Sequence, residues 1–496
     1  MSQEPPSSLA PGANPAARPV SPTFVALVAL ALLAFYAVFT QRGVGASDWY
    51  GYYQEGLLFR QGRVTLSTPL PAAEFPAQAP LGFIVHDGRT VPQYTPGYPL
   101  LLALAGLAGL QFYVTPLVGV LSFLLMFRIV RRRTDPRTGL LFAFLWAMTP
   151  IVIWGSTQLM SDLVAATALM LVYELCMVRR AAWAGAALVF AIAVRPTDGL
   201  FIVFLPALLP GWRARIRAAL GAALPAAAYG AYNLVNFGAP WRTGYMNVGG
   251  DLLPAVAGRN LAFYAVHLLA ELGPVALLLA AASLVKNPRK SWLQAAWFAA
   301  VAGFYLFWRY PGVDNTWWWF RFVLPGLPPL FLLAADGYAC MRRTLAEGRA
   351  ARFARPVKAT VLTALLAMPV VSVFFCHHEH ILATTKGLEY RDVVLASERM
   401  IPAGAWLGSV EFSGSTRLYT PLHSFMSANG DAPNLVAHLT ATGAPVYLLV
   451  EPWNTSRAWL RLLFTRFRAE PVHRFPIWNG VMLYRLRAHD RPAASP

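Results

Sequence analysis

The chain has 496 residues, of which 57% are hydrophobic and only 13% are charged, and its mean hydropathy is +0.47. This charged share is about half that of a soluble domain, which excludes an ordinary cytosolic enzyme, and apolar runs recurring along the first 376 residues predict a polytopic membrane protein. The net charge of +18 is concentrated at the ends of those runs, as the positive-inside rule requires, so we predict no nucleic-acid partner.

Residues 1–21 are rich in Pro, Ala and Ser and lack the pattern of a signal peptide. We expect them to form a disordered cytoplasmic tail. The first membrane span is predicted over Pro22–Thr40. A polar stretch follows, residues 41–97, with many Gly and Pro, several acids and no spanning segment. It is expected to form a large loop on the outer face of the membrane.

Residues 98–130 are mostly apolar, and they are too many for one straight span and too few for two spans with a turn. The arginines at 131–133 should face the cytoplasm, so only one crossing fits, over Phe112–Val130. Tyr98–Leu110 is then expected to be a helix that lies in the outer interface.

The same reasoning predicts spans along the rest of the first 376 residues. They are Gly139–Gly155, Gln158–Val178, Trp183–Val194, Gly199–Leu209, Ala218–Val235, Glu271–Val285, Trp292–Trp308, Phe322–Met341 and Val357–Phe375. The expected fold is an α-helical transmembrane domain over residues 22–376 with about eleven transmembrane helices, the N-terminus inside and the C-terminus outside. Two spans, at 183–194 and 199–209, are short, so the number could fall by two without changing the charge on either face.

Residues 388–496 change character and predict a small extracytoplasmic α/β domain. Helices are expected over Leu388–Met400, Pro433–Thr442 and Thr455–Phe467. Strands are expected over Ala405–Glu411, Pro445–Glu451, Pro471–Phe475 and Val481–Leu486.

Two acids on the expected outer face are candidates for catalysis. Asp48 follows the first span closely and lies among aromatic residues in GASDWYGYYQEG, and Asp162 lies beside Ser161 near the outer end of a later span. Each is also explained as the cap of a helix. Because ionisable groups near membrane depth usually face a cavity, two carboxylates at one level are suited to general-base catalysis or to holding a cation.

Two outer arginines are exceptions to the positive-inside rule. Arg195 lies in AVRPTDG and Arg321 in WWWFRFVLPGLPP. A guanidinium at this depth can hold a lipid phosphate by two parallel hydrogen bonds. The alternative is that each arginine only reaches out to lipid headgroups.

The run HHEH at residues 377–380 resembles a metal cluster, but adjacent histidines at the end of a helical span cannot all face one ion. We interpret it as a solvated segment at the membrane interface. The chain has no Gly-rich phosphate loop, no zinc-finger spacing and no nucleophile elbow.

Several motifs follow one another in a fixed order along residues 22–376. An acid comes directly after the first span, and YTPGYPLLLAL ends the first loop. SD, VRPT, YNLVNFGAPWRTGY (Tyr232 to Tyr245) and RFVLPGLPPLFLLAADG (from Arg321) follow. This order resembles the GT-C superfamily of polyprenyl-phosphate-sugar-dependent membrane glycosyltransferases. More narrowly, it is similar to the bacterial branch related to protein O-mannosyltransferases and the lipid A aminoarabinose transferase.

The resemblance implies roles for individual residues. Asp48 matches the first-loop acid that acts as general base on the acceptor or helps to position it, and Asp162 matches a second acid that supports acceptor or cation binding. Arg321 matches the arginine that contacts the donor phosphate, and Arg195 could assist it. Where the family often has an Asp-Glu pair, Asp48 is followed by Trp, and the nearest Glu is Glu55.

The implied function is sugar transfer, hexosyl or pentosyl, from a polyprenyl-phosphate carrier to a lipid, glycan or protein acceptor on the outer face of a bacterial inner membrane. A single displacement would invert the anomeric centre. The substrate cavity is expected to include Glu55, Tyr94, Tyr98 and Tyr245. No cofactor is predicted. Since no outer DxD motif is present, a divalent metal is allowed for but not expected.

Two other classes of protein remain open at this point. One is a lipid or polysaccharide transporter or flippase, which would place ionisable groups near the bilayer midplane and often shows inverted repeats. No repeat is visible in this sequence. The other is a non-catalytic membrane scaffold whose C-terminal domain binds a wall component.

Overall fold

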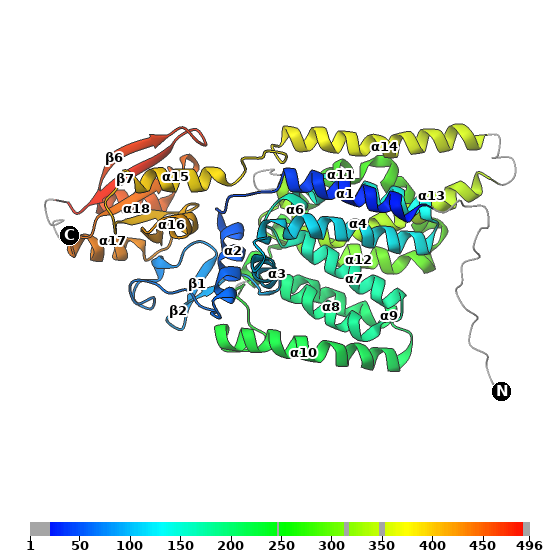
Figure 1. Cartoon of the computed structure of the whole chain (residues 1–496), viewed down its shortest axis with the longest axis horizontal. Helices are drawn as coiled ribbons and strands as arrows, with labels where there is room; N and C mark the ends of the chain where they lie inside the picture. Colours follow the sequence, from blue (N-terminus) through cyan, green and yellow to red (C-terminus); the bar gives the residue numbers. More distant parts are fainter. Residues whose placement is uncertain (1–19, 246–247, 312–316, 347–352, 490–496) are drawn as a thin grey trace.

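The computed structural model describes residues 20–245, 248–311, 317–346 and 353–489, so the predicted tail at 1–21 lies outside the described residues except for its last two. Figure 1 shows long helices gathered side by side in a bundle, with a smaller region that contains a β-sheet at one end. The helix α2 (Ser47–Arg60) lies between the two.

The bundle is made of helices that are apolar along most of their length. Its main members are α1 (Pro22–Val38), α4 (Val114–Arg133), α5 (Pro136–Ala147), α6 (Pro150–Thr157), α7 (Asp162–Met177), α8 (Ala181–Val194), α10 (Gly211–Phe237), α11 (Ala257–Lys286), α12 (Pro288–Leu306), α13 (Pro328–Thr344) and α14 (Ala354–His378). Within the described ranges, 3 helical segments are long and apolar enough to cross a membrane, or up to 5 if each bent pair counts as one span. The expected number of about eleven is therefore not confirmed.

Prolines explain where the expected spans are interrupted. The predicted span 139–155 is bent by 65° between α5 and α6, and Pro150 begins the second piece. The predicted span 199–209 is wrong as a continuous helix. It consists of a 3-10 helix, η3 (Pro196–Val203), and a four-residue helix, α9 (Leu205–Leu208). Proline has no backbone N–H to continue a helical ladder, so Pro196 and Pro206 each restart the helix.

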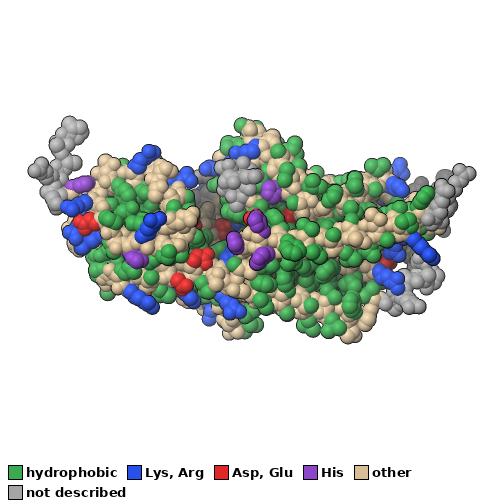
Figure 2. Space-filling view, turned by 90° about the horizontal axis from the view of Figure 1, so that it is seen from above, with side chains coloured by type: hydrophobic (Ala, Val, Ile, Leu, Met, Phe, Trp, Pro, Cys, Tyr) green, Lys and Arg blue, Asp and Glu red, His purple; other side chains and the backbone are tan. Residues whose placement is uncertain are grey.

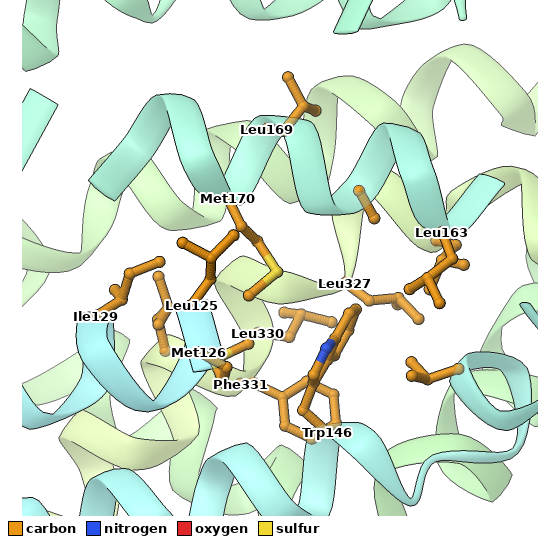
Figure 3. Packing of buried hydrophobic residues seen from close by; sticks show 14 of the residues in the cluster. Leu125, Met126, Ile129, Trp146, Leu163, Leu169, Met170, Leu327, Leu330 and Phe331 are labelled. Atoms are coloured by element: carbon orange, nitrogen blue, oxygen red, sulfur yellow. The ribbon is translucent and has the colours of Figure 1, made fainter. Parts of the chain in front are cut away.

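The centre of the bundle is packed with large apolar side chains from α4, α5, α7 and α13, as Figure 3 shows. Trp146 is fully buried, meets the ring of Phe331 edge-on at 5.4 Å, and donates a 3.0 Å hydrogen bond from its indole N–H to the hydroxyl of Ser122. In a bilayer, lipid tails are as apolar as these side chains, so close packing rather than exclusion of water stabilises such contacts.

The arginine-rich helix ends lie at the end of the bundle away from the sheet. The start of α4 lies beside the C-terminal end of α1. The hydroxyl of Thr40, just after α1, donates a 3.1 Å hydrogen bond to the carbonyl of Phe112, just before α4. The 20 residues of α4, at about 1.5 Å per residue, then carry Arg131–Arg133 to the opposite end. Figure 2 shows blue Lys and Arg side chains at that end and mostly hydrophobic side chains along the bundle.

The first loop contains α2, a hairpin of β1 (Phe83–His86) and β2 (Arg89–Pro92), and then α3 (Gly97–Gly106). The hairpin turns at Asp87 and Gly88, whose φ values of 46° and 72° suit an Asp-Gly turn. The helix that was expected from Tyr98 is present as α3.

The C-terminal segment, residues 388–487, contains a five-stranded sheet in the order β4-β3-β5-β7-β6. Its elements are α15 (Leu388–Glu398), β3 (Trp406–Ser409), α16 (Ser413–Tyr419), β4 (His423–Met426), α17 (Ala432–Ala441), β5 (Val446–Val450), α18 (Ala458–Arg466), β6 (Arg468–Phe475) and β7 (Val481–Arg487). The predicted strands match β3, β5, β6 and β7. The helix α16 and the strand β4 were missed because they are short and polar. The division into a separate outer domain stays a prediction.

The C-terminal segment is joined to the first loop by close backbone packing. The N–H of Val44 donates to the hydroxyl of Tyr419 at 2.8 Å, and the hydroxyl of Ser415 donates to the Val44 carbonyl at 3.1 Å. A Cβ on Gly43 would lie 1.9 Å from the carbonyl oxygen of Gly387. The segment 43–45, which precedes α2, therefore packs directly against α16 and Gly387.

We expect Gly43→Ala to loosen this contact, because the added methyl group has no space without a backbone shift. Overpacking of this kind costs about 1–3 kcal/mol. Thermal unfolding of the purified full-length protein in detergent should show a lower Tm for Gly43→Ala. Gly199→Ala is the matched control, since a Cβ there meets nothing within 4 Å. Equal Tm values for the two variants would contradict this account of the junction.

Candidate active site

The centre of the candidate site is an ion pair between the first loop and a 3-10 helix of the bundle, η6 (Trp317–Gly326). Asp48 is the second residue of α2, and its Oδ2 lies 2.8 Å from Nη2 of Arg321 in an ion pair. Its other oxygen, Oδ1, accepts a 2.5 Å hydrogen bond from the hydroxyl of Tyr94. The Asp48 side chain keeps 26% of its surface exposed, whereas that of Arg321 keeps 9%. The carboxylate is thus oriented on two sides and open on another.

Arg321 is surrounded mainly by aromatic rings. Its guanidinium carbon lies 4.9 Å from the ring centre of Trp318, 5.2 Å from Phe322 and 5.8 Å from Trp154. These contacts favour a cation. Its Nε has no partner among the described residues, and Nη1 faces only the sulfur of Met160, at 3.5 Å. A guanidinium has five N–H donors, so this one retains hydrogen-bonding capacity for an anion.

A second ion pair lies beside the first. Asp162 begins α7 and pairs with Arg195, which follows α8 directly. Nη2 of Arg195 also donates to the hydroxyl of Tyr305 at 2.8 Å. The ring centre of Phe322 lies 5.5 Å from the guanidinium carbon of Arg195 and 5.2 Å from that of Arg321, so both arginines contact the same ring. The structure therefore brings together the four charged residues that the sequence singled out.

Tyrosines connect the two ion pairs. The hydroxyl groups of Tyr52 and Ser161 lie 2.8 Å apart, which joins α2 to the start of α7. The Tyr52 ring centre is 4.5 Å from that of Tyr94 and 5.1 Å from that of Tyr98, and Tyr94 is 6.1 Å from Tyr245. The three tyrosines expected in the substrate cavity thus gather around Tyr52, for which no role was predicted.

Glu55, which was expected in the substrate cavity, lies apart from Asp48. It is fully buried, and its Oε1 accepts a 2.7 Å hydrogen bond from the hydroxyl of Tyr232 on α10. Burial raises the pKa of Glu55 to about 8. Asp48 and Glu55 are seven residues apart on α2, about 10 Å along the axis. Glu55 therefore does not complete a carboxylate pair with Asp48.

Glu411 is a neighbour of Asp48 that the sequence analysis missed. It follows β3, and its backbone N–H donates to Oε1 of Glu451, which follows β5, at 2.9 Å. Burial and the nearby charges of Glu451 and Asp48 raise the pKa of Glu411 to about 7. β3 and β5 are parallel, and functional residues often lie at the carboxyl ends of parallel strands. That rule, applied to the predicted strand 405–411, could have identified Glu411.

No group of three His, Cys, Asp or Glu residues within the described ranges is arranged to hold a metal ion. His377 and His378 form the last two residues of α14, and His380 lies just beyond it. Two surface hollows are lined by residues other than the four of the ion pairs. One is beside α15 and lined in part by Glu389, and the other lies between the β1–β2 hairpin and Asn429. The candidate site is therefore defined here by its charged groups.

No protein-family model matches the chain, and no curated protein matches it in sequence. Solved structures do resemble it. ArnT from Cupriavidus metallidurans bound to undecaprenyl phosphate has a TM-score of 0.57 and 13% identity, over 93% of this chain and 97% of that one.

Two further structures are similar over most of this chain. The archaeal oligosaccharyltransferase AglB from Archaeoglobus fulgidus, in complex with an inhibitory peptide and a dolichol-phosphate, has a TM-score of 0.59 and 11% identity over 95% of this chain and 75% of that one. The arabinofuranosyltransferase AftD from Mycobacteria has a TM-score of 0.53 and 12% identity, over 96% of this chain and 40% of that one. At these identities the likeness concerns the fold.

Proposed function

We propose that this chain, which has the fold of the GT-C glycosyltransferases, moves a sugar from a polyprenyl-phosphate carrier to an acceptor. The observation that carries the proposal is the pair of Asp48 and Arg321, in which a partly open carboxylate lies 2.8 Å from a buried guanidinium with unused donors. The undecaprenyl phosphate in ArnT and the dolichol-phosphate in AglB support a lipid phosphate as the ligand class.

In the proposed reaction, the unused N–H groups of Arg321 bind the phosphate of the carrier. The phosphate competes with Asp48 for the guanidinium, so the carboxylate becomes available as a base. Asp48 accepts the proton of an acceptor hydroxyl while the hydroxyl oxygen forms a bond to the anomeric carbon. The bond from that carbon to the phosphate oxygen breaks, and polyprenyl phosphate leaves with the electron pair. Arg321 stabilises the charge on the departing phosphate.

Asp162 and Arg195 have a supporting role in this scheme. The Asp162 side chain pairs with Arg195 and is only 4% exposed, against 26% for Asp48, so Asp48 is the more accessible of the two carboxylates to an acceptor hydroxyl. Arg195 and Arg321 both lie against the ring of Phe322, so Arg195 is near enough to support the binding of the phosphate by Arg321. One displacement inverts the anomeric centre, and Tyr94, Tyr98 and Tyr245 line the space for substrate. We propose that this end of the bundle faces outward from a bacterial inner membrane, with the N-terminus inside.

The sequence also left a transporter open, and the position of the charges argues against one. Transporters place ionisable groups near the bilayer midplane. Here both ion pairs lie at the end of the bundle next to α2 and the C-terminal sheet.

Reconstitution into vesicles with a labelled polyprenyl-phosphate sugar and a membrane extract as the source of acceptor tests the proposal. A transferase releases free polyprenyl phosphate and moves the label to a new product. A transporter moves the lipid-linked sugar across the bilayer intact. Intact translocation, or no release of polyprenyl phosphate with any sugar tested, would refute the proposed function.

A further inference from the structure

A second group of buried polar side chains lies where α2 meets α10. Glu55 accepts its hydrogen bond from Tyr232 here, and Tyr229 is an electrostatic neighbour of Glu55. Tyr229, Tyr232, Asn233 and Asn236 are spaced three and four residues apart, so they share one face of α10. These five residues are called the α2–α10 polar cluster below.

Several hydrogen-bonding atoms of this cluster make no well-formed hydrogen bond among the described residues, although Tyr229 lies close to Asn233 and Tyr232 lies close to Asn236. The unpaired atoms are Oε2 of Glu55, the hydroxyl of Tyr229, Oδ1 of Asn233, and both Oδ1 and Nδ2 of Asn236. Glu55 and Asn236 are 0% exposed, and Asn233 is 1% exposed. An unsatisfied buried polar atom costs about 1–3 kcal/mol, and native proteins leave few of them. Their concentration in one place indicates a site for a polar ligand.

The chemistry of the cluster fits an uncharged ligand with hydroxyl groups. Amide and hydroxyl groups both donate and accept, as sugar hydroxyls do. Burial raises the pKa of Glu55 to about 8, so its carboxyl group is protonated at neutral pH and can donate as well. The ring of Phe59, which is only partly buried, lies 6.1 Å from that of Tyr232 and offers an apolar surface that suits the C–H face of a sugar ring.

We propose that the α2–α10 polar cluster is a subsite that binds the uncharged hydroxyl groups of a sugar. This inference rests on the proposed function, because it makes the cluster a specificity subsite of the transferase. Asp48, Tyr52 and Glu55 lie on one face of α2, and Asp48 and Glu55 are about 10 Å apart along the axis. A mono- or disaccharide can bridge this distance. The sugar can belong to the donor or to the acceptor, and both would present the same hydroxyl chemistry.

Two variants of the full-length protein test the subsite. Asn236→Leu removes two unpaired atoms, so its Tm should equal or exceed that of the wild type. Tyr232→Phe removes the hydroxyl that bonds to Glu55. Asn260→Leu is the control, because the amide of Asn260 already donates to the carbonyls of Leu306 and Trp308, at 2.9 and 2.7 Å. The control should have a lower Tm and unchanged sugar selectivity.

Binding is measured with farnesyl phosphate that is sugar-free or carries glucose, mannose, arabinose or glucosamine, and with free methyl glycosides of the neutral sugars. If the donor sugar occupies the subsite, a neutral sugar should tighten farnesyl phosphate binding to the wild type about tenfold. Asn236→Leu should lose this gain in affinity. In Tyr232→Phe, the affinity for the sugar-bearing farnesyl phosphate should be about three- to tenfold lower than in the wild type. The affinity of both variants for sugar-free farnesyl phosphate should equal that of the wild type.

If the acceptor sugar occupies the subsite instead, methyl glycosides should raise the Tm of the wild type but not that of Asn236→Leu.

The subsite is refuted if neutral sugars add nothing in either arm, if both variants respond as the wild type does, or if only the charged aminosugar binds more tightly. The result is separable from a failure of the proposed function. A wild-type protein that binds no farnesyl phosphate, yet gains stability from methyl glycosides, would contradict the transferase and support the sugar subsite.

Discussion

Asp48→Asn is expected to lower the turnover of sugar transfer by about 10²–10⁴-fold, because an amide cannot accept the proton of the acceptor hydroxyl. The amide keeps the size of the carboxylate and can still accept a hydrogen bond from Tyr94. Binding of the donor should therefore change less than turnover. The measurement is the initial rate of polyprenyl phosphate release at saturating donor, with the wild type and the variant at equal amounts of folded protein.

Asp251→Asn is the matched control for this variant. Asp251 also pairs with an arginine, Arg309, at 3.0 Å, and its side chain has the same 26% exposure as that of Asp48. It lies outside the cluster of tyrosines and should keep wild-type turnover. A folded Asp48→Asn protein that turns over at the wild-type rate would remove Asp48 from the mechanism.

Arg321→Met is expected to lower kcat/KM for the lipid-phosphate donor by about 10²–10⁴-fold, since two hydrogen bonds to a charged phosphate contribute about 1.5–3 kcal/mol each. Arg321→Lys should fall between the wild type and Arg321→Met, because an ammonium keeps the charge but cannot make two parallel bonds. Steady-state kinetics with varied donor at fixed acceptor gives these values. Arg309→Met is the control, because Arg309 is half exposed and pairs only at the surface.

The double variant Asp48→Asn/Arg321→Met shows whether the two residues act as a unit. If they do, its turnover should fall little below that of the worse single variant, because residues that act together lose their effects non-additively. Fully additive losses would mean that Asp48 and Arg321 work in separate steps. An Arg321→Met protein with the wild-type KM for donor would place the phosphate elsewhere.

The sequence analysis selected Asp48, Asp162, Arg195 and Arg321 because each is a charged residue on the expected outer face of the membrane. The reason is physical, since charge near a bilayer is costly and survives mainly where a partner or cavity exists. The pairing of these residues could not be predicted. Asp48 pairs with Arg321 from η6, 273 positions away in the sequence, and this depends on how a 3-10 helix packs against α2.

The positions of Glu55 and Glu411 depend on tertiary packing, which the composition of the chain does not determine. Glu55 was expected in the substrate cavity, but its contact with Tyr232, about two helical turns from Asp48, could not be predicted from the sequence. Glu411 was missed because it lies more than 350 residues from Asp48 in the sequence, in a segment whose docking relies on glycine contacts at residues 43 and 387. The count of spans depended on where prolines break helices.

The most direct measurement is a structure of the full-length protein with a non-hydrolysable phosphonate analogue of a polyprenyl-phosphate sugar, determined by electron cryo-microscopy in a lipid nanodisc. We expect the phosphonate to lie within hydrogen-bonding distance of the guanidinium of Arg321 and the anomeric carbon to face the carboxylate of Asp48. A phosphonate bound at another place, with Arg321 still paired to Asp48, would contradict it.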